Sequence, residues 1–508
     1  MSRKKSRVAH HPPQTLTARD QCLRNQDLLQ EILTFGARNP ADLMSARRTL
    51  YSAALTSKVF SGCAVRILWR RLSHLLPLLR LLPTFRLEGG VYIVPGLVTE
   101  EEWAVVRRYA AYVRDIEFEP YPGGVSLHPS VYVLLAMRGR PLFPNLRRLA
   151  LLTTDYVAEM LLCLSAGVKS LTLESVSGVW AQTFFDRLVS DGAHLSYLSF
   201  WNCDRSNPPL LNSITFQTLK VLELYGMGAG FTAAHLTEVA SLPELQSFAT
   251  DMAAWDNVEF TSFARQSLFQ TLTELKIIAI PARLHRNISD LLSAVGARDM
   301  QSLSIGAVMG GRWEATTHSA AVFSAIMRCI GAPWATTLRH LNVLHIPGSH
   351  DDLAPLGQVT GLQSVSLTHV LHEPLSDARA LSVIRALTNL RTLEIDGPGA
   401  EADVTFLRCL AEHCPALRTL RVAYTAAPPP ALDAAAAAAP APYHLLEELR
   451  FIPLGRGDTW NRTKITRLAQ YFDHFFPALV AIRGEGHLWW EEVEQLVFEC
   501  QDRRRRTS

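Results

Sequence analysis

The sequence lacks long apolar runs, and this absence excludes a class of protein. No stretch of 18 consecutive apolar residues occurs among its 508 residues, so we expect no helix that spans a membrane. The first thirty residues also lack the apolar segment of a secretory signal. We therefore expect a protein of the cytoplasm, the nucleus or both.

Cysteine pairs and catalytic motifs are also missing. The eight cysteines are scattered, and none forms a C-x-x-C pair, which argues against a disulfide framework and against a zinc site. Neither a G-x-S-x-G elbow nor a G-x-x-x-x-G-K-[ST] phosphate loop is present. The sequence therefore predicts a protein that is not an enzyme and that uses no metal and no cofactor.

No long stripe of one charge runs through the body of the chain. The 50 Lys and Arg residues and 47 Asp and Glu residues nearly cancel, which leaves a net charge of +3. This balance argues against nucleic acid as the main partner. Basic runs stand at both ends, and we expect residues 1–20 and 501–508 to be disordered basic tails, with a nuclear-import signal as the alternative.

What the sequence does contain is a repeated pattern, apolar-x-x-apolar-x-apolar, which we call a rung. Of the twelve steps between successive rungs, ten lie between 22 and 29 residues, and leucine-rich repeats have periods of 20 to 29 residues. A single rung has no diagnostic value because leucine is so common, but thirteen at a nearly constant period do. The rungs start at Val113, Leu146, Val168, Leu195, Leu219, Leu245, Leu272, Met300, Leu338, Leu362, Leu390, Leu417 and Leu446.

The clearest rung, residues 390–395, shows how each repeat would work. In a strand, side chains alternate between two faces, so Leu393 and Ile395 would point to the core and Thr392, Glu394 and Asp396 to the other face. Apolar residues at helical spacing in residues 377–388 predict a helix before this strand. One such unit cannot bury its apolar face alone, but stacked units can. We therefore predict an α/β solenoid, a leucine-rich-repeat arc with parallel strands inside and helices outside.

The changes of pattern along the chain suggest domain boundaries. We assign residues 21–73 to a small all-α module of three amphipathic helices, 74–112 to a linker or N-terminal cap, 113–458 to the solenoid, and 459–500 to a C-terminal cap. In that cap, Trp489, Val493 and Leu496 would cover the last apolar face. We expect an insertion around residues 310–317 and a low-complexity surface loop at residues 423–442.

The N-terminal module carries a family resemblance. Residues 28–33 (LLQEIL), 53–60 (AALTSKVF) and 65–72 (VRILWRRL) together resemble an F-box, in the form found in fungal F-box/leucine-rich-repeat proteins. Residues 101–103 (EEW) and 109–116 (YAAYVRDI) resemble the segment that joins box and repeats in that family, and residues 410–417 (LAEHCPAL) resemble its repeats.

The resemblance implies a function. Such a protein is the substrate-recognition subunit of an SCF-type E3 ubiquitin ligase, in which a Skp-family linker binds the box, a cullin binds the linker, and ubiquitin transfer to the bound protein substrate takes place on partner subunits. The residues that would meet the linker, or the module's own core, are Leu28, Leu29, Ile32, Leu33, Leu55, Phe60, Val65, Leu68 and Trp69. The alternative is a leucine-rich-repeat scaffold that is not coupled to a ligase, since residues 24–26 (RNQ) stand where the family has Leu-Pro.

The outward positions of the strands are the candidate site for a protein substrate. Trp201 and Tyr225 hold the same position in successive rungs, so their rings should lie side by side. An aromatic anchor between carboxylates would suit a basic or arginine-bearing peptide; alternatively, the two rings cover the neighbouring loops. The candidate residues are Tyr197, Trp201, Glu223, Tyr225, Asp251, Glu274, Lys276, Glu394 and Asp396.

Overall fold

A computed structural model describes most of the chain as two compact units. The first comprises residues 1–172 and 184–193, the second residues 173–183 and 194–508. Strand β7 (Ser170–Glu174) and helix α9 (Gly178–Ser190) are divided between them. The described residues are 25–36, 43–119, 121–139, 141–203, 216–226, 231–255, 258–263, 268–280, 285–307, 317–331, 333–397, 399–424, 444–452, 461–484 and 489–507.

The first unit begins with the expected helical module. Helices α2 (Gln26–Gly36) and α3 (Leu43–Thr56) both pack against α4 (Lys58–Leu68). Asn25 caps α2, since its Oδ1 accepts hydrogen bonds from the backbone N–H groups of Asp27 and Leu28 at 3.1 and 3.2 Å. Ser57 caps α4 in the same way through the backbone N–H of Phe60.

The third helix of the module does not include all of residues 65–72, the last segment that resembles an F-box. It ends at Leu68, and Leu72 lies instead in strand β1 (Arg71–Leu72), which pairs in parallel with β4 (Asp115–Phe118). The reason is tertiary: Leu72 is only 3% exposed, because it joins the core under the first strands. The module therefore runs directly into the sheet, one strand before the first rung expected at Val113.

The segment between the module and the repeats, expected only as a linker or cap, contains several helices and strands. In the first unit, β4 pairs in parallel with β6 (Arg148–Leu151), and β2, β3 and β5 form a separate small sheet. The other elements of this unit are α5 (Leu76–Leu79), β2 (Arg86–Glu88), β3 (Val91–Ile93), α6 (Glu100–Ala110), η2 (Pro122–Gly124), β5 (Ser126–Leu127), α7 (Pro129–Met137), η3 (Thr154–Tyr156) and α8 (Val157–Cys163).

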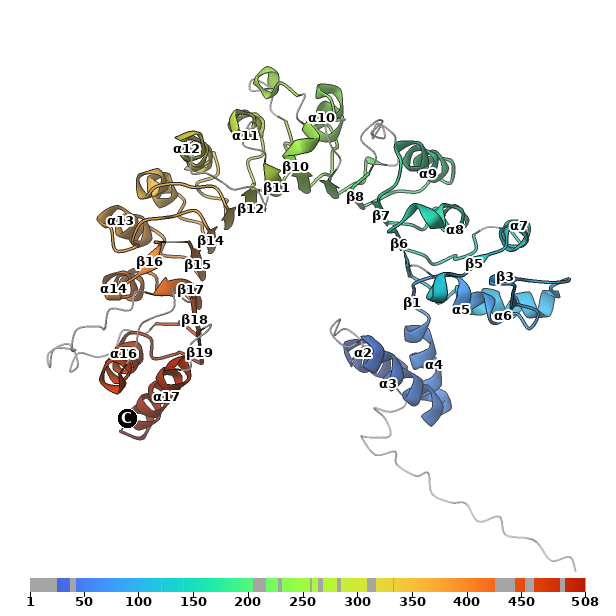
Figure 1. Ribbon diagram of the computed structural model, residues 1–508, viewed down its shortest axis with the longest axis horizontal. Helices are drawn as coiled ribbons and strands as arrows, with labels where there is room; N and C mark the ends of the chain where they lie inside the picture. The colour runs from blue at the N-terminus through green and yellow to red at the C-terminus, as the bar shows by residue number, and fades with distance from the viewer. Residues whose placement is uncertain are drawn as a thin grey trace, which may run out of the picture. The chain divides into compact units, whose positions relative to one another are not determined.

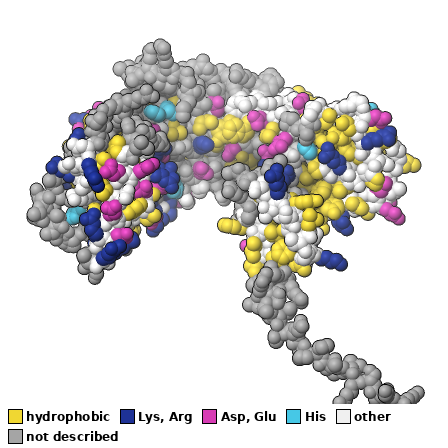
Figure 2. Space-filling view, turned by 60° about the horizontal axis from the view of Figure 1, so that its bottom comes forward, with side chains coloured by type: hydrophobic (Ala, Val, Ile, Leu, Met, Phe, Trp, Pro, Cys, Tyr) yellow, Lys and Arg dark blue, Asp and Glu magenta, His cyan; other side chains and the backbone are white. Residues whose placement is uncertain are grey.

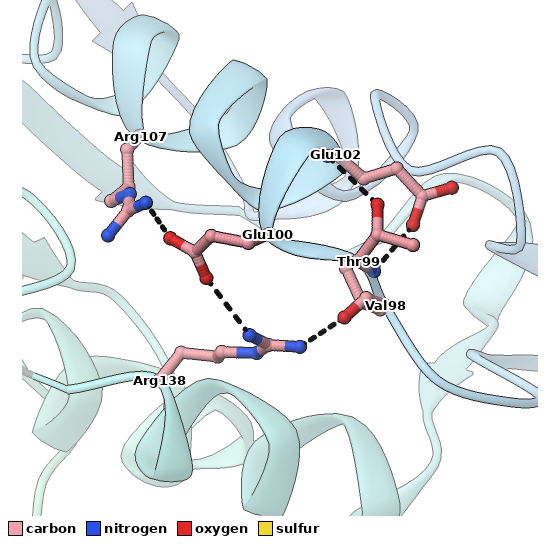
Figure 3. Close-up of polar contacts among 6 residues, drawn as sticks. All are labelled: Val98, Thr99, Glu100, Glu102, Arg107 and Arg138. Atoms are coloured by element: carbon pink, nitrogen blue, oxygen red, sulfur yellow. Dashed lines mark hydrogen bonds and ion pairs between the residues drawn. The ribbon is translucent and has the colours of Figure 1, made fainter.

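Helix α6 is held in place at its N-terminus. Thr99 and Glu102 form a capping box, with hydrogen bonds of 2.8 and 3.3 Å between each side chain and the other residue's backbone N–H. Arg138, at the end of α7, binds both the Glu100 carboxylate and the Val98 carbonyl oxygen (Figure 3). These contacts tie α6 to α7 and fix the joining segment within the first unit.

The second unit is a stack of strand–helix repeats. Strands β8 to β15 pair in parallel in the order of the chain, followed by β17, β18 and β19, with β16 paired at the side of β17. Helices lie along one face of these strands (Figure 1). The strands are β8 (Tyr197–Trp201), β9 (Val221–Tyr225), β10 (Ser247–Asp251), β11 (Glu274–Ile280), β12 (Ser302–Ala307), β13 (His340–Leu344), β14 (Ser364–Thr368), β15 (Thr392–Asp396), β16 (Glu401–Ala402), β17 (Thr419–Tyr424), β18 (Glu448–Ile452) and β19 (Ala481–Gly484).

The segments between these strands contain the helices. Helix α13 matches the helix expected in residues 377–388 and is capped by the Asp377 side chain. The segments are α10 (Ala233–Ala240), η5 (Met252–Trp255), η6 (Phe260–Phe263), α11 (His285–Ala294), α12 (Thr317–Gly331), η8 (His350–Gln358), α13 (Ala378–Ala386), α14 (Val404–His413), α16 (Arg462–Phe475) and α17 (Trp489–Thr507).

The rung pattern predicts the strands closely. Every one of the thirteen rungs contains a strand that starts at its third position, and the fourth and sixth positions are buried, as with Leu393 and Ile395 at 1% and 3% exposure. The α/β solenoid is thus confirmed. The rung that starts at Leu245 has Thr250 at its sixth position, and the core accommodates this hydroxyl because Trp255 Nε1 donates a 2.7 Å hydrogen bond to it.

The C-terminal end corrects two expectations. Residues 501–507 are not a disordered tail: they continue helix α17, where Arg504 pairs with Asp473 and the Gln501 amide donates to the Leu479 carbonyl oxygen at 3.1 Å. The buried side chains of this helix include Trp490, Val493 and Val497, whereas Trp489 and Leu496 are only half-buried. The expected cap is present, but its buried face is turned by one residue from the predicted one.

Some expectations lie outside the described residues. These are the N-terminal tail at 1–20, the insertion around 310–317 apart from its last residue, and most of the low-complexity loop at 423–442. In the part of the chain that the structure describes, no helix has both the length and the apolarity needed to cross a membrane.

Candidate functional site

The helical module exposes a second apolar stripe on two of its helices. On α2, Leu29 is buried in the module while Leu28, Ile32 and Phe35 are 39%, 57% and 78% exposed. On α3, Leu50 is buried while Tyr51 and Leu55 are 62% and 70% exposed. Hydrophobic side chains are visible on the surface of the module in the lower part of Figure 2. We call these five exposed side chains the module face.

The predicted linker-contacting residues divide between this face and the interior. Leu28, Ile32 and Leu55 lie on the module face, and Leu29 lies inside the module. The remaining five are half-buried: Leu33, Phe60, Val65, Leu68 and Trp69. Phe35 and Tyr51 were missed, although the sequence contains their signal: Phe35 is seven residues after Leu28, and Tyr51 is four residues before Leu55, both helical spacings.

Trp69 packs against a segment outside the module. From the sequence, we expect Trp69 to meet the linker or the module's own core. In the structure its ring packs on that of Tyr109 in α6, with 4.7 Å between the ring centroids. Trp69 therefore joins the module to the next segment of the first unit, and the exposed aromatic side chains of the module are Phe35 and Tyr51.

On the strand face of the second unit, Trp201 and Tyr225 do lie side by side. Their ring centroids are 4.4 Å apart, as expected for equivalent positions on paired strands. Lys276 Nζ lies 5.7 Å from the centroid of the Tyr225 ring, within cation–π distance. Tyr225 is only 5% exposed, whereas Trp201 is 40% exposed. A cation of this chain thus already occupies the position over Tyr225, so Trp201 is the exposed member of the pair.

Glu223 organises the polar groups beside these rings. Its carboxylate accepts hydrogen bonds from the Tyr197 hydroxyl at 2.7 Å and the Ser199 hydroxyl at 2.9 Å, and Trp201 Nε1 donates to Ser199 Oγ at 2.8 Å. Burial, together with the hydrogen bond to Glu223, raises the pKa of Tyr197 to about 12. The network fixes the Trp201 indole on the strand face. It also buries Ser199, an outward position that alternation alone would leave open.

The other candidate residues of the strand face form two further groups. Glu274 on β11 accepts a 3.0 Å hydrogen bond from Ser247 at the start of β10. Asp251 is the last residue of that same strand β10. Glu394 on β15 pairs with Arg421 on β17 at 2.5 Å. Glu394 and Asp396 therefore lie four strands away from Glu274 and Lys276, and the structure does not bring all nine candidates together. The carboxylate linked to the exposed indole is that of Glu223 on the adjacent strand β9, through the Ser199 hydroxyl.

Two cysteines of the second unit, Cys203 and Cys414, are packed in its interior. Cys203 Sγ lies 3.6 Å from both the Leu173 and the Trp201 carbonyl oxygens, and burial raises the pKa of its thiol to about 11. Cys414 is fully buried and lies 3.5 Å from the Ile384 carbonyl oxygen. Within the part of the chain that the structure covers, no group of three His, Cys, Asp or Glu residues could hold a metal ion.

Comparisons with known proteins do not assign the chain to a family. No protein-family model matches the chain, and no curated protein matches it. Among solved structures, the chain is similar to one described as the crystal structure of a TLR13–ssRNA13 complex, with 15% sequence identity and a TM-score of 0.34. The similarity covers 75% of this chain and 44% of that one. The chain is thus defined by its own architecture: an α/β repeat solenoid with a helical module that exposes apolar side chains.

Proposed function

We propose that this protein is the substrate-recognition subunit of an SCF-type E3 ubiquitin ligase. In this proposal the helical module is an F-box that docks on a Skp-family linker, the linker binds a cullin, and the strand face of the repeats binds a protein substrate. Ubiquitin transfer takes place on the partner subunits. The observation that carries the proposal is the module face, formed by Leu28, Ile32, Phe35, Tyr51 and Leu55.

The module face has the character of a docking surface. A single exposed apolar side chain is normal on any protein, but a set that repeats at helical spacing on two helices of one small module marks an interaction site. Burying such side chains contributes roughly 25 cal/mol per Å² of apolar area, and Phe35 and Tyr51 offer two aromatic anchors. The neighbouring Leu29, Leu50 and Cys63 are each at most 5% exposed, so the module has its own core besides this face.

The strand face fits the second half of the proposal. It offers an exposed indole, Trp201, fixed by hydrogen bonds and adjacent to the Glu223 carboxylate. A protein segment could bind there through an aromatic contact and charge-assisted hydrogen bonds. Because the Glu223 carboxylate lies beside the Trp201 indole and Lys276 lies over the Tyr225 ring, we expect the partner segment to carry both a basic and an acidic or polar group.

Co-purification with a Skp-family linker and a cullin tests the proposal. We expect the full-length protein to bring down both, and we expect Ile32→Asp and Leu55→Asp to reduce recovery of the linker at least about tenfold, because each change buries a charge in the interface. Val480→Asp is the matched control, since Val480 is 69% exposed in the second unit and lies outside the module. Equal recovery with all variants, or no recovery with the unmodified protein, would refute the docking proposal.

The second candidate is a leucine-rich-repeat scaffold that is not coupled to a ligase. It is favoured by the start of α2, where the Asn25 side chain caps the helix at the place where the family has Leu-Pro. In that case the strand face would still bind a protein partner, but neither linker nor cullin would co-purify. The same experiment therefore separates the two functions.

A further inference from the structure

An arginine-rich pocket lies in the first unit, where the helical module meets the first strands. Its volume is about 630 Å³, which is within the range of small-molecule sites. The lining combines α2 and α4 of the module with the residues that precede and begin β1, β4 and β6. These residues are Gln30, Thr34, Arg66, Ile67, Arg70, Ala111, Tyr112, Arg114, Asp115, Asn145, Arg147 and Arg148.

The charge of this lining is strongly one-sided. Five guanidinium groups face a single carboxylate, that of Asp115, whereas the whole chain has a net charge of only +3. Asp115 pairs with Arg148 at 2.9 Å and lies 3.8 Å from Arg70. The lone carboxylate is thus already shared between two of the five cations, and the pocket keeps a large excess of positive charge.

Three of the arginines have no carboxylate partner among the described residues: Arg66, Arg114 and Arg147. Arg114 Nη1 donates to the Asn145 carbonyl oxygen at 3.3 Å, which leaves its charge uncompensated. Arg66, Arg70, Arg147 and Arg148 are exposed to solvent and Arg114 is half-buried, so solvent weakens the repulsion among these cations without removing it. An anion that enters the pocket would relieve this repulsion.

The backbone sets the spacing of these arginines. The Arg70 carbonyl oxygen accepts a 2.9 Å hydrogen bond from the Arg114 N–H, and the Arg114 carbonyl oxygen accepts one of 2.7 Å from the Arg147 N–H. Arg70, Arg114 and Arg147 therefore stand at equivalent positions, each immediately before one of the adjacent strands β1, β4 and β6, and such strands lie about 4.8 Å apart. Such a row suits a ligand with several anionic groups a few ångströms apart, and a guanidinium binds phosphate oxygens in pairs.

We propose that this pocket binds a compact polyanion that carries at least two phosphate groups. Gln30, Thr34 and Tyr112 add neutral hydrogen-bonding groups to the lining, which can contact the non-ionic parts of the ligand. Because the lining joins α2 and α4 to the first strands, a bound polyanion would tie the helical module to the repeats that follow it.

Inorganic tripolyphosphate is the probe for this site, with orthophosphate at equal phosphate concentration and ionic strength as the comparison. The full-length protein is titrated by calorimetry, and its melting temperature is followed at each probe concentration. We expect tripolyphosphate to bind and to raise the melting temperature, and orthophosphate to have a much smaller effect.

Paired substitutions locate the site. We expect Arg114→Gln combined with Arg147→Gln to weaken tripolyphosphate binding at least about tenfold, because two phosphate contacts are lost. The matched control is Arg339→Gln combined with Arg391→Gln: these arginines hold the same rung position in the second unit, and no ion pair with a described residue involves them. Equal weakening in both pairs, equal effects of tripolyphosphate and orthophosphate, or no binding to the unmodified protein would each overturn the proposal.

Discussion

Helices α2 and α14 illustrate how two amphipathic helices of one chain can serve different ends. On α14, Phe406, Leu407 and Leu410 are fully buried, and the outer positions carry the Arg408–Glu412 ion pair at 2.7 Å. On α2, Leu29 is buried and Leu33 is half-buried on the inner side, but the outer stripe is apolar. The inner stripe of a helix therefore indicates how the helix packs in the folded chain. The outer stripe indicates whether the helix faces solvent or a further binding surface.

The largest expected effect is on the free energy of unfolding, and it distinguishes a core leucine from an exposed one. Leu420→Ala, in the core of the second unit at 0% exposure, should lower the free energy of unfolding by about 2–5 kcal/mol, because it leaves a cavity among neighbouring strands. Leu55→Ala, on the module face at 70% exposure, should change it by less than about 0.5 kcal/mol. Urea denaturation of both variants measures the difference. A large destabilisation by Leu55→Ala would show that this side chain belongs to the folded core.

The next effect concerns binding and contrasts two tryptophans. Trp201→Ala, on the strand face at 40% exposure, should weaken capture of protein partners at least tenfold, because interface tryptophans contribute about 2 kcal/mol or more. Trp180→Ala is the matched control, since Trp180 is 41% exposed on helix α9. Affinity purification with proteasome activity blocked, followed by quantitative mass spectrometry, compares the two. Similar losses with both variants would argue against a strand-face site.

A buried carboxyl in the first unit should make stability fall as pH rises. Glu159 is 1% exposed and accepts hydrogen bonds from the Tyr121 and Tyr132 hydroxyls at 3.1 and 2.5 Å. Burial raises the pKa of Glu159, against the opposing effect of these hydrogen bonds. The folded state therefore holds the proton more tightly, so this stabilisation is complete below the unfolded pKa of about 4.3 and is lost as pH rises through the folded value.

Glu159→Gln tests this linkage. The amide stays neutral at every pH, so the variant should lose less stability than the unmodified protein between pH 5 and pH 8. Urea midpoints at several pH values measure the change. Parallel pH profiles for the two proteins would show that Glu159 does not titrate in this range.

A histidine pair in the second unit should make stability fall as pH falls, the opposite of the effect of Glu159. The rings of His345 and His369 stack with centroids 4.9 Å apart. Burial and the neighbouring His369 lower the pKa of His345, while Asp396 acts in the other direction. The neutral form is favoured on folding, so this stabilisation is complete above the unfolded pKa of about 6.5 and is lost as pH falls from that value through the lower folded pKa.

His345→Asn should flatten this pH dependence. His345 has a φ of 57°, a left-handed conformation that Asn tolerates better than most residues, so the fold should survive the change. Melting temperatures between pH 5 and pH 8 measure the slope. If the variant retains the full loss of stability on acidification, other groups must cause it.

The smallest expected effect on stability concerns the ion pair on the outer side of α14. Glu412→Gln removes an exposed ion pair with Arg408 between positions one helical turn apart, and such pairs contribute about 0.3–0.5 kcal/mol. The change should therefore lower the free energy of unfolding by no more than about 0.5 kcal/mol, and less at high salt. Denaturation at low and high salt checks this. A larger, salt-independent loss would indicate that Glu412 has a packing role.

The repeats could be predicted from the sequence because their signal is local. A strand alternates its side chains with a period of two, and each repeat contacts mainly its neighbours. The spacing of apolar residues therefore identified the strands, their buried positions and the side-by-side placement of Trp201 and Tyr225. The outer stripe of α2 was partly predictable too, since Leu28 and Ile32 follow helical spacing.

Contacts between residues far apart in the chain could not be predicted in this way. Trp69 packs on Tyr109, and Arg504 in the last helix pairs with Asp473. Periodicity says which face of a segment is apolar, but not which side chain of another segment comes to lie beside it.

By itself, the sequence determined the repeating strands and the apolar surfaces, since both follow from the direction of each side chain within its own segment. Only the tertiary structure decided that Lys276 would occupy the position over Tyr225 and that five arginines from separate segments would line one pocket. Those outcomes depend on the packing of whole elements against one another, which no local pattern specifies.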